Sequence, residues 1–388
     1  MKCKIMKEDV LEGIQKASSI IPARTGAAFL RTIWLEARDG VLRIMSTDSK
    51  LEFSGQYPAT IEEEGLIGVH GRNYFELMRK LPPGEMELQA DMDAQSLLIK
   101  QEKRKYKLPT YDPTWFQNFS PFPEEKAIQW SGDFLRELIE HISFCIADDN
   151  TDQMYYMKIS PLEDSKTIEV CGLNGHQFAM QRFEHQAMFS LLGEEGFLIA
   201  KPYLLELRKW LPNEELQFTV NDKRLFFTNQ KQNEIFSLPV SYDLFPKYEL
   251  FLTYFQNETS SMALDKDELL ESLDRLSIFN TETQRCSYFV FDDQELVIYS
   301  QGQDTGEATE TIPMDFQGSL DKIVFPTKNL IEVLHHFESD LIRLEFTTNN
   351  GPCKISGDDD PGYVVIIMPV EIKEETYYTD EVVEEEQL

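Results

Sequence analysis

Side chains that could do acid–base or metal chemistry gather in two short segments of the sequence. His176, in the Asn-Gly-His-Gln segment 174–177, is a candidate general base, and Asp358, Asp359 and Asp360 are candidate metal ligands. A histidine in a turn is more often structural, and an aspartate run beside a glycine is usually a solvated loop. The sequence has no glycine-rich phosphate-binding motif, no H-E-x-x-H and no nucleophile elbow. We predict no catalytic residue, no metal and no cofactor, and keep a hydrolase built on His176 as an alternative.

A second set of side chains is cationic and recurs along the chain. Each member follows a glutamate by three residues, in the segments 71–82, 200–212 and 327–337, and the glutamates lie 130 and 126 residues apart. At about 100° per residue on a helix, the apolar residues of each segment share one face and the cation lies nearly opposite. The apolar sets are Tyr74, Leu77 and Leu81; Leu204, Leu207 and Leu211; and Leu330, Val333 and Phe337, and the cations are Arg79, Lys209 and His335. One such helix is ordinary, but three in register indicate a repeat.

The segments around these helices repeat with the same period. Each third begins with a short strand and a helix, for which Ser131 and Asp265 are predicted N-caps in the second and third copies. A hairpin follows, turning at Asp39-Gly40 in the first copy, and then a strand leads into the cationic helix. Each copy closes on an apolar residue and a proline, and these prolines (Pro109, Pro239 and Pro369) are spaced by 130 residues. The predicted fold class is α+β, with three tandem repeats of a two-helix, mostly antiparallel β domain.

Length and composition fit this organisation. The 388 residues divide into predicted domains 1–126, 127–258 and 259–372, followed by an acidic tail, 373–388, predicted to be disordered.

No apolar run is long enough for a membrane span and no signal peptide follows Met1, so a cytoplasmic location is predicted. The five cysteines are predicted to be reduced. A net charge of −31 argues against simple electrostatic binding of nucleic acid, so a DNA role would need local charge segregation or topology.

Several short segments give the sequence a family resemblance. They are Arg24 after Ile-Pro-Ala, Tyr155-Tyr156, Asn174–His176, Phe245–Tyr248 and Met368-Pro369. With the three concatenated domains, they resemble the bacterial DNA polymerase III beta subunit, the DNA sliding clamp, over residues 1–372. The resemblance implies a non-catalytic processivity factor, a head-to-tail homodimer that closes into a ring around duplex DNA, associated with the nucleoid during replication. The alternative from another class is an acidic three-domain scaffold that binds peptides but not DNA.

The resemblance also implies two sets of surface residues. Residues expected to face DNA, without sequence specificity, are Arg24, Arg72, Arg79, Lys80, Tyr155, Tyr156, Lys201, Arg208, Lys209 and His335. For the dimer interface, the basic hairpin strand Lys100–Lys107 is expected to pair with an acidic strand. That interface comprises Lys103, Arg104, Lys105, Tyr106, Lys107, Leu108, Ile278, Phe279, Asp304, Glu307 and Glu310. A hairpin made basic only for solubility is the simpler alternative.

A hydrophobic peptide-binding pocket is the third feature that the resemblance implies. Its residues are Met157, Leu173, Gly175, His176, Gln177, Phe178, Pro246, Phe251, Pro326, Asn329, Ile366, Met368 and Val370. The expected partners are the replicative polymerase, the clamp loader and repair polymerases, each bound through a linear motif. Any one of these residues could instead be an ordinary core side chain. The sequence departs from the usual family pattern at Leu173, Gln177, Asn329 and Glu371, which affects the expected motif preference.

Overall fold

The computed structural model describes residues 1–22, 27–123, 126–150, 152–163, 166–193, 195–221, 223–256, 259–281, 285–292, 294–302 and 304–371. Arg24 and the predicted acidic tail lie outside these ranges. The chain forms two compact units, the first made of Met1–Gly175 and Ala179–Pro246 and the second of His176–Phe178 and Lys247–Leu388. The predicted boundaries of three domains stay a prediction.

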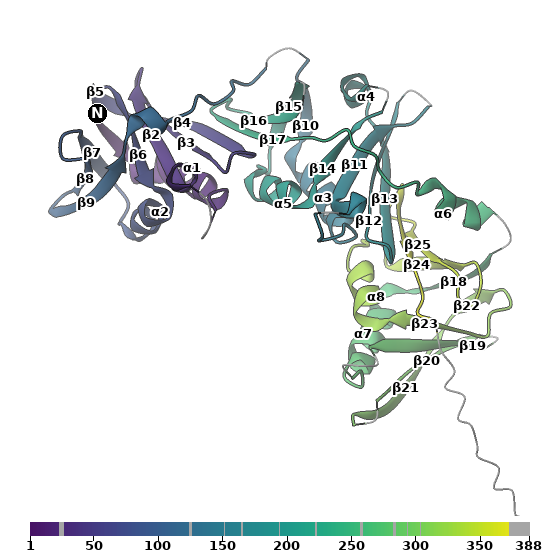
Figure 1. The fold of residues 1–388 in the computed structure, drawn as a ribbon. Helices are drawn as coiled ribbons and strands as arrows, with labels where there is room; N and C mark the ends of the chain where they lie inside the picture. The colour runs from purple at the N-terminus through teal and green to yellow at the C-terminus, as the bar shows by residue number, and fades with distance from the viewer. Residues whose placement is uncertain are drawn as a thin grey trace, which may run out of the picture. The chain divides into compact units, whose positions relative to one another are not determined.

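The first third of the chain, within the first unit, is a β-rich body that carries two helices (Figure 1). The two helices lie next to each other, and the hairpin between β2 and β3 turns at Asp39 and Gly40, both with positive φ, as predicted. The elements in chain order are β1 (Lys2–Met6), α1 (Lys7–Ser19), β2 (Thr32–Arg38), β3 (Val41–Thr47), β4 (Glu52–Pro58), β5 (Thr60–Glu63), β6 (Gly65–His70), α2 (Gly71–Lys80), β7 (Glu85–Asp91), β8 (Ser96–Gln101) and β9 (Arg104–Tyr111).

The rest of the first unit repeats this order and adds a helix. The added helix is α4, which the sequence pattern did not predict. The elements are β10 (Ile128–Ser131), α3 (Gly132–Ser143), β11 (Tyr156–Pro161), β12 (Thr167–Leu173), β13 (Gln177–Glu184), α4 (Gln186–Leu192), β14 (Phe197–Ala200), α5 (Lys201–Trp210), β15 (Glu215–Asn221), β16 (Arg224–Asn229) and β17 (Glu234–Pro239). Gln177 and Phe178, at the start of β13, group with the second unit.

A thirteen-stranded sheet runs through the first unit, whose strands β14, β11, β12 and β13 are neighbours in a second sheet. The order of the thirteen strands is β10-β15-β16-β17-β4-β3-β2-β6-β9-β8-β7-β1-β5. The antiparallel pairing of β17 with β4, with Phe236 opposite Phe53, joins strands far apart in the sequence. Both phenylalanines are fully buried, so the joint is part of the core and stabilised by apolar burial.

The second unit repeats the same pattern around two sheets. One has the order β26-β25-β24-β18-β22 and the other β21-β20-β19-β23, with α7 and α8 in contact. The elements are α6 (Glu249–Thr253), β18 (Ser260–Asp265), α7 (Lys266–Ser277), β19 (Cys286–Asp292), β20 (Glu295–Gly302), β21 (Gly306–Pro313), β22 (Asp315–Gln317), β23 (Lys322–Pro326), α8 (Thr327–Leu334), β24 (Leu341–Phe346), β25 (Cys353–Gly357) and β26 (Tyr363–Ile367).

The helix ends agree with the predicted caps, with two adjustments. Ser131 Oγ accepts a hydrogen bond from the Phe134 N–H and an Asp265 carboxylate oxygen from the Glu268 N–H, as predicted. Helix α8 ends at Leu334, so His335 is its C-cap rather than part of its last turn. In α2 the buried face comprises Tyr74 and Met78, and Leu77 is only half-buried. No helix in the described part of the chain is long and apolar enough to cross a membrane.

Candidate functional site

The predicted cationic face exists on all three repeated helices. Arg79, Lys209 and His335 are exposed, in line with the sequence-based expectation. Arg79 Nη2 lies 2.8 Å from Glu76 Oε2, and Lys209 Nζ lies 2.6 Å from Glu206 Oε1. Arg79 and Lys209 therefore each form an ion pair with a glutamate on their own helix, and such exposed pairs contribute about 0.2 to 1 kcal/mol. The helix surface presents paired charges rather than a strong positive field.

The other residues expected to face DNA have different surroundings. Arg72 and Lys80 are exposed, and Arg208 Nη1 lies 3.6 Å from Glu140 Oε1. Lys201 is largely buried, because its Nζ donates to the Ile146 carbonyl and pairs with Asp148, each at 2.7 Å. These contacts join the start of α5 to the segment that follows α3, and the expectation that Lys201 faces DNA stays a prediction.

Tyr155 and Tyr156, also expected to face DNA, form a pair at the start of β11. Their rings meet edge to face, with centroids 5.8 Å apart, and both side chains are half-buried. Burial raises the pKa of Tyr155, so its hydroxyl stays protonated and can donate a hydrogen bond.

Three further cations, which sequence reasoning missed, fasten the helix pairs together. Lys7 Nζ donates to the Leu81 carbonyl, Arg136 Nη2 donates to the Leu211 carbonyl at 2.7 Å, and Lys266 Nζ donates to the Phe337 carbonyl at 2.9 Å. In each third, a cation on the first helix thus satisfies carbonyls just beyond the second helix, which have no intrahelical partner. The signal in the sequence was a cation near the start of each first helix, but its target lies more than 70 residues away.

The basic segment expected at the dimer interface is a hairpin of two strands, β8 and β9, rather than one strand. Lys100 on β8 lies opposite Lys105 on β9, and its Nζ pairs with Glu87 at 2.9 Å. Lys103, Arg104, Lys105 and Lys107 are exposed, whereas Tyr106 and Leu108 are half-buried. Strand β9 meets β6 only at Thr110 and Tyr111, so among the described residues its basic first half pairs with β8 alone. This half is an open sheet edge rich in positive charge.

The acidic residues of the second unit divide into two groups. Glu307 is exposed on β21, an edge strand whose sheet neighbour is β20, and Asp304 lies in the preceding turn rather than on the strand. Glu310 points to helix α7, where Arg275 donates to both of its carboxylate oxygens at 2.8 and 2.7 Å. These hydrogen bonds hold the pKa of Glu310 below its usual range. Glu310 thus already has a cationic partner within the chain, and its place at a dimer interface stays a prediction.

Ile278 is 71% exposed just beyond the end of α7, and Phe279 beside it is half-buried. An isoleucine this exposed is consistent with the predicted apolar part of an interface.

The predicted pocket residues of the first unit are mostly core residues. Met157 on β11 and Leu173 on β12 are buried, and Pro246 is half-buried. Gly175 is exposed with φ +87°, a backbone conformation that favours glycine over residues with a side chain.

The predicted pocket residues of the second unit include several on its surface. Phe251, on α6, is 38% exposed and Val370, beyond β26, is 37% exposed. The Met368 N–H donates to the carbonyl of the exposed His176 at 2.9 Å, and the Val370 N–H donates to the Val324 carbonyl at 2.8 Å. These two hydrogen bonds fix the backbone N–H groups of Met368 and Val370, while the apolar side chain of Val370 remains accessible.

The remaining predicted pocket residues of the second unit are buried or half-buried. Gln177, Phe178 and Ile366 are buried, and Phe178 stacks on Tyr248 with ring centroids 5.2 Å apart. Pro326 and Asn329, at the start of α8, are half-buried, as is Met368.

The carboxylates considered for metal or acid–base chemistry have structural partners. Asp360 is buried and accepts hydrogen bonds from the Glu338 N–H, the Ser339 N–H and the Ser339 hydroxyl, at 2.9, 3.0 and 2.5 Å. It therefore caps the chain after α8. No group of three His, Cys, Asp or Glu in the described ranges could hold a metal ion. His176 lies in a different exposed turn, and its carbonyl is engaged by Met368.

Comparison with known proteins gives one family for both ends of the chain. Residues 1–120 match the DNA polymerase III beta subunit, N-terminal domain, and residues 255–371 match its C-terminal domain. The beta sliding clamps of Haemophilus influenzae and Pseudomonas putida are 22% and 24% identical, over 96% and 95% of this chain and 100% of each relative. The crystal structure of the DNA polymerase sliding clamp from Bacillus subtilis has a TM-score of 0.87, with 22% identity, and the match covers 96% of this chain and 100% of that one. The chain therefore belongs to the family of bacterial DNA polymerase III beta subunits, the non-catalytic DNA sliding clamps.

Proposed function

We propose that two copies of this chain close head to tail into a ring that encircles duplex DNA and keeps a replicative polymerase on its template. The observation that carries the proposal is the threefold repeat of a helix with a buried apolar face and an exposed basic residue, which lies on the helix in the first two copies and at its C-cap in the third. In a ring these faces line the opening, and the acidic excess of the −31 chain lies elsewhere.

The paired charges on these helices suit sliding. Strong contacts between cations and phosphate hold a protein in place and make its binding depend steeply on salt. In this chain Arg79 and Lys209 already have a glutamate partner within 3 Å. DNA therefore meets a weakly attractive wall, and closure of the ring supplies retention.

Closure follows from open strand edges of opposite charge. The first half of β9 carries exposed Arg104, Lys105 and Lys107, and β21 carries exposed Glu307. Unpaired edges are templates for pairing with another chain, and opposite charges fix which edges meet. Within one chain, β17 pairs with β4 and so continues a sheet across two distant segments. Ile278, exposed beyond α7, supplies the apolar contact.

The partner-binding surface belongs to the second unit. Phe251 and Val370 are accessible apolar side chains, and Met368 is half-buried beside the held backbone. Exposed apolar groups around a fixed backbone suit a linear motif with aliphatic or aromatic anchors, the kind expected of polymerases and a clamp loader. Replacing Met368 and Phe251 with alanine should weaken binding of a polymerase-derived motif peptide by about 1 to 3 kcal/mol.

Topological retention is the decisive experiment. The chain is loaded on nicked circular DNA by a clamp loader, and its loss is followed after the circle is linearised. A ring stays on the circle and leaves the linear molecule by sliding off its ends. Loading on neither would favour an acidic peptide-binding scaffold, and equal retention on both would show that the chain holds DNA without encircling it. Replacing Arg79, Lys209 and His335 with glutamine should reduce loading and its salt dependence while the fold stays intact.

A further inference from the structure

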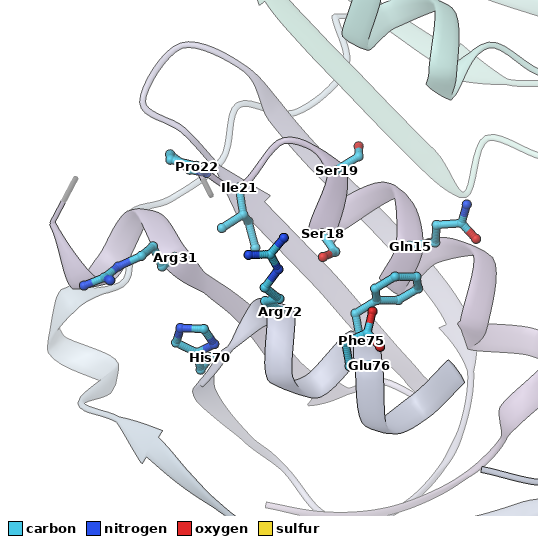
Figure 2. A pocket seen from close by; sticks show the side chains of 10 residues that line it. All are labelled: Gln15, Ser18, Ser19, Ile21, Pro22, Arg31, His70, Arg72, Phe75 and Glu76. Carbon is cyan, nitrogen blue, oxygen red and sulfur yellow. The ribbon is translucent and has the colours of Figure 1, made fainter. Parts of the chain in front are cut away.

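The sheet of each third has a helix side and an outer side. Figure 2 shows the helix side of the first third, with Arg72 and Phe75 of α2 facing the end of α1. A Cβ on Gly71, the first residue of α2, would lie 3.1 Å from Ile33 Cγ1 on β2. Ile33 therefore faces the helices, and Trp34, the next residue of β2, faces the outer side.

Trp34 has an equivalent in each of the other two copies. Each lies on the strand after the first helix and pairs with the residue three positions before the second helix. In the third copy, Ser287 Oγ lies 2.8 Å from Thr327 Oγ1 at the start of α8, so the next residue of β19, Tyr288, faces away from that helix. The three pairs are Trp34 with Gly68, Lys158 with Leu198, and Tyr288 with Val324.

In the first two copies an aromatic residue covers this place. The ring of Phe116 meets that of Trp34 edge to face, with centroids 5.5 Å apart. In the second copy, Lys158 Nζ lies 5.9 Å from the centroid of the Phe245 ring. Both phenylalanines belong to the segment that follows the proline closing their copy, seven residues after it in the first and six in the second. Each of these two copies is thus covered on its outer side by the segment that comes next in the chain.

The third copy has a surface for such a segment but no aromatic cover in the described part of the chain. The rings of Tyr288 and Tyr299 stack with centroids 4.7 Å apart, and Lys322 Nζ lies 4.6 and 5.2 Å from the two centroids. Among the described residues, neither ring meets an aromatic ring outside this pair, and Lys322 has no ion pair. We call these three half-buried side chains the tyrosine face.

The segment beyond the third closing proline matches the tyrosine face in position, rings and charge. The Val370 N–H donates to the carbonyl of Val324, which lies opposite Tyr288, so the chain enters this segment at the edge of the same sheet. Tyr377 and Tyr378 follow eight and nine residues after the closing proline, close to the spacing of the first two copies. The acidic residues around them are Glu374, Glu375, Asp380 and Glu381.

We propose that residues 372–388 dock on the tyrosine face, with the Tyr377–Tyr378 pair over its rings and a carboxylate of the segment on Lys322. Aromatic rings gain from edge-to-face and offset contact, and a carboxylate supplies the anionic partner that this ammonium group lacks among the described residues. The occupant is a segment of this chain because the chain itself brings it to the sheet edge, as it does in the first two copies. The docking lies within one chain and does not depend on ring closure.

Photo-crosslinking of the full chain tests the contact directly. Tyr378 is replaced by the photoreactive p-benzoylphenylalanine, and the crosslinked peptides are identified by mass spectrometry after irradiation. Crosslinks within one chain should fall on β19, β20 and β23. Lys322→Gln should lower their yield at least threefold. Lys354→Gln is the matched control, because Lys354 Nζ also lies over an aromatic ring, 5.5 Å from the centroid of Phe255, but on the other sheet of the second unit, and its yield should stay unchanged.

The reactivity of the Lys322 amine gives a second measurement. Its acetylation by acetic anhydride should be at least threefold faster in a chain truncated after Ile372 than in the full chain, while Lys354 reacts equally in both. Circular dichroism confirms the fold of each variant.

Several results would overturn the proposal. Crosslinks around Phe251 and Val370 would place the segment on the partner-binding surface instead, and crosslinks between chains would place it on a second copy. Crosslinks spread over the whole surface, or none, would show that the segment does not dock. Equal yields in the two glutamine variants, or equal acetylation of Lys322 with and without the segment, would contradict the assigned contact with the lysine.

Discussion

A buried carboxylate, that of Glu234, lies at the joint between β17 and β4. The loss of stability on its removal can be worked out from its contacts. Glu234 is 6% exposed; its Oε1 accepts from the Tyr57 hydroxyl at 2.7 Å, and its Oε2 lies 2.7 Å from Lys16 Nζ. Lys16 is 15% exposed and also pairs with Glu12 at 2.8 Å. We predict that Glu234→Ala destabilises this joint far more than the loss of a surface ion pair would.

The magnitude follows from what each partner loses. Removing one partner of a buried ion pair costs about 3 to 5 kcal/mol when the remaining charge is left alone. Lys16 keeps Glu12 as a partner, although Glu12 is well exposed, so we expect about half of that cost, about 2 kcal/mol. The Tyr57 hydroxyl also loses its hydrogen-bond acceptor, which costs about 1 kcal/mol more of stability. Glu234→Ala should therefore cost about 3 kcal/mol, and Glu234→Gln, which keeps an acceptor for Tyr57, about 2 kcal/mol.

Amide hydrogen exchange measures this cost where it arises. Opening of the joint exposes the N–H groups paired between β17 and β4, around Phe236 and Phe53. A loss of about 3 kcal/mol corresponds to roughly a hundredfold faster exchange, since 1.4 kcal/mol is a factor of ten. Glu12→Gln is the matched control, because it removes the exposed partner of the same lysine and should change exchange less than about fivefold. The reasoning is refuted if Glu234→Ala and Glu12→Gln exchange at the same rate.

Two further predictions concern the second unit and the basic hairpin. Reversing Lys103, Arg104 and Lys105 to glutamate should place like charges against β21 and yield monomers, and an unchanged dimer mass in sedimentation would remove this interface. The pKa of Glu310 is lowered by Arg275, so the stability that this pair adds is complete above the unfolded pKa of about 4.3 and is lost as the pH falls through the lower folded value. Arg275→Gln should therefore be less stable than wild type in urea at pH 7 and equal to it at pH 2, and a constant difference would contradict this assignment.

Local patterns predicted the elements of the fold because their causes lie within a few residues. The Asp39-Gly40 turn, the Ser131 and Asp265 caps and the apolar faces of α5 and α8 each depend on neighbours in the sequence. Helix α4 escaped prediction, because its seven residues are too few to show a clear period.

Contacts between distant segments could not be predicted in the same way. The Lys7, Arg136 and Lys266 side chains bind carbonyls that any residue type would offer, so nothing in the target sequence marks them. Glu234 and Tyr57 are 177 residues apart, and their contact depends on the register of β17 against β4. The pairing of Glu310 with Arg275 could not be predicted for a related reason. Period 2 on β21 places Glu310 on the face covered by α7, with Ile312, and leaves Glu307 on the other face.

The three copies of the repeat join the ends of their helix pairs by different contacts. The scaffold needs only that each helix pair be joined, and Lys201 or the Asn280–Thr327 contact does so with polar groups. At the equivalent place in the first copy, Gly71 approaches the Ile21 side chain, so the helix ends meet through an apolar contact.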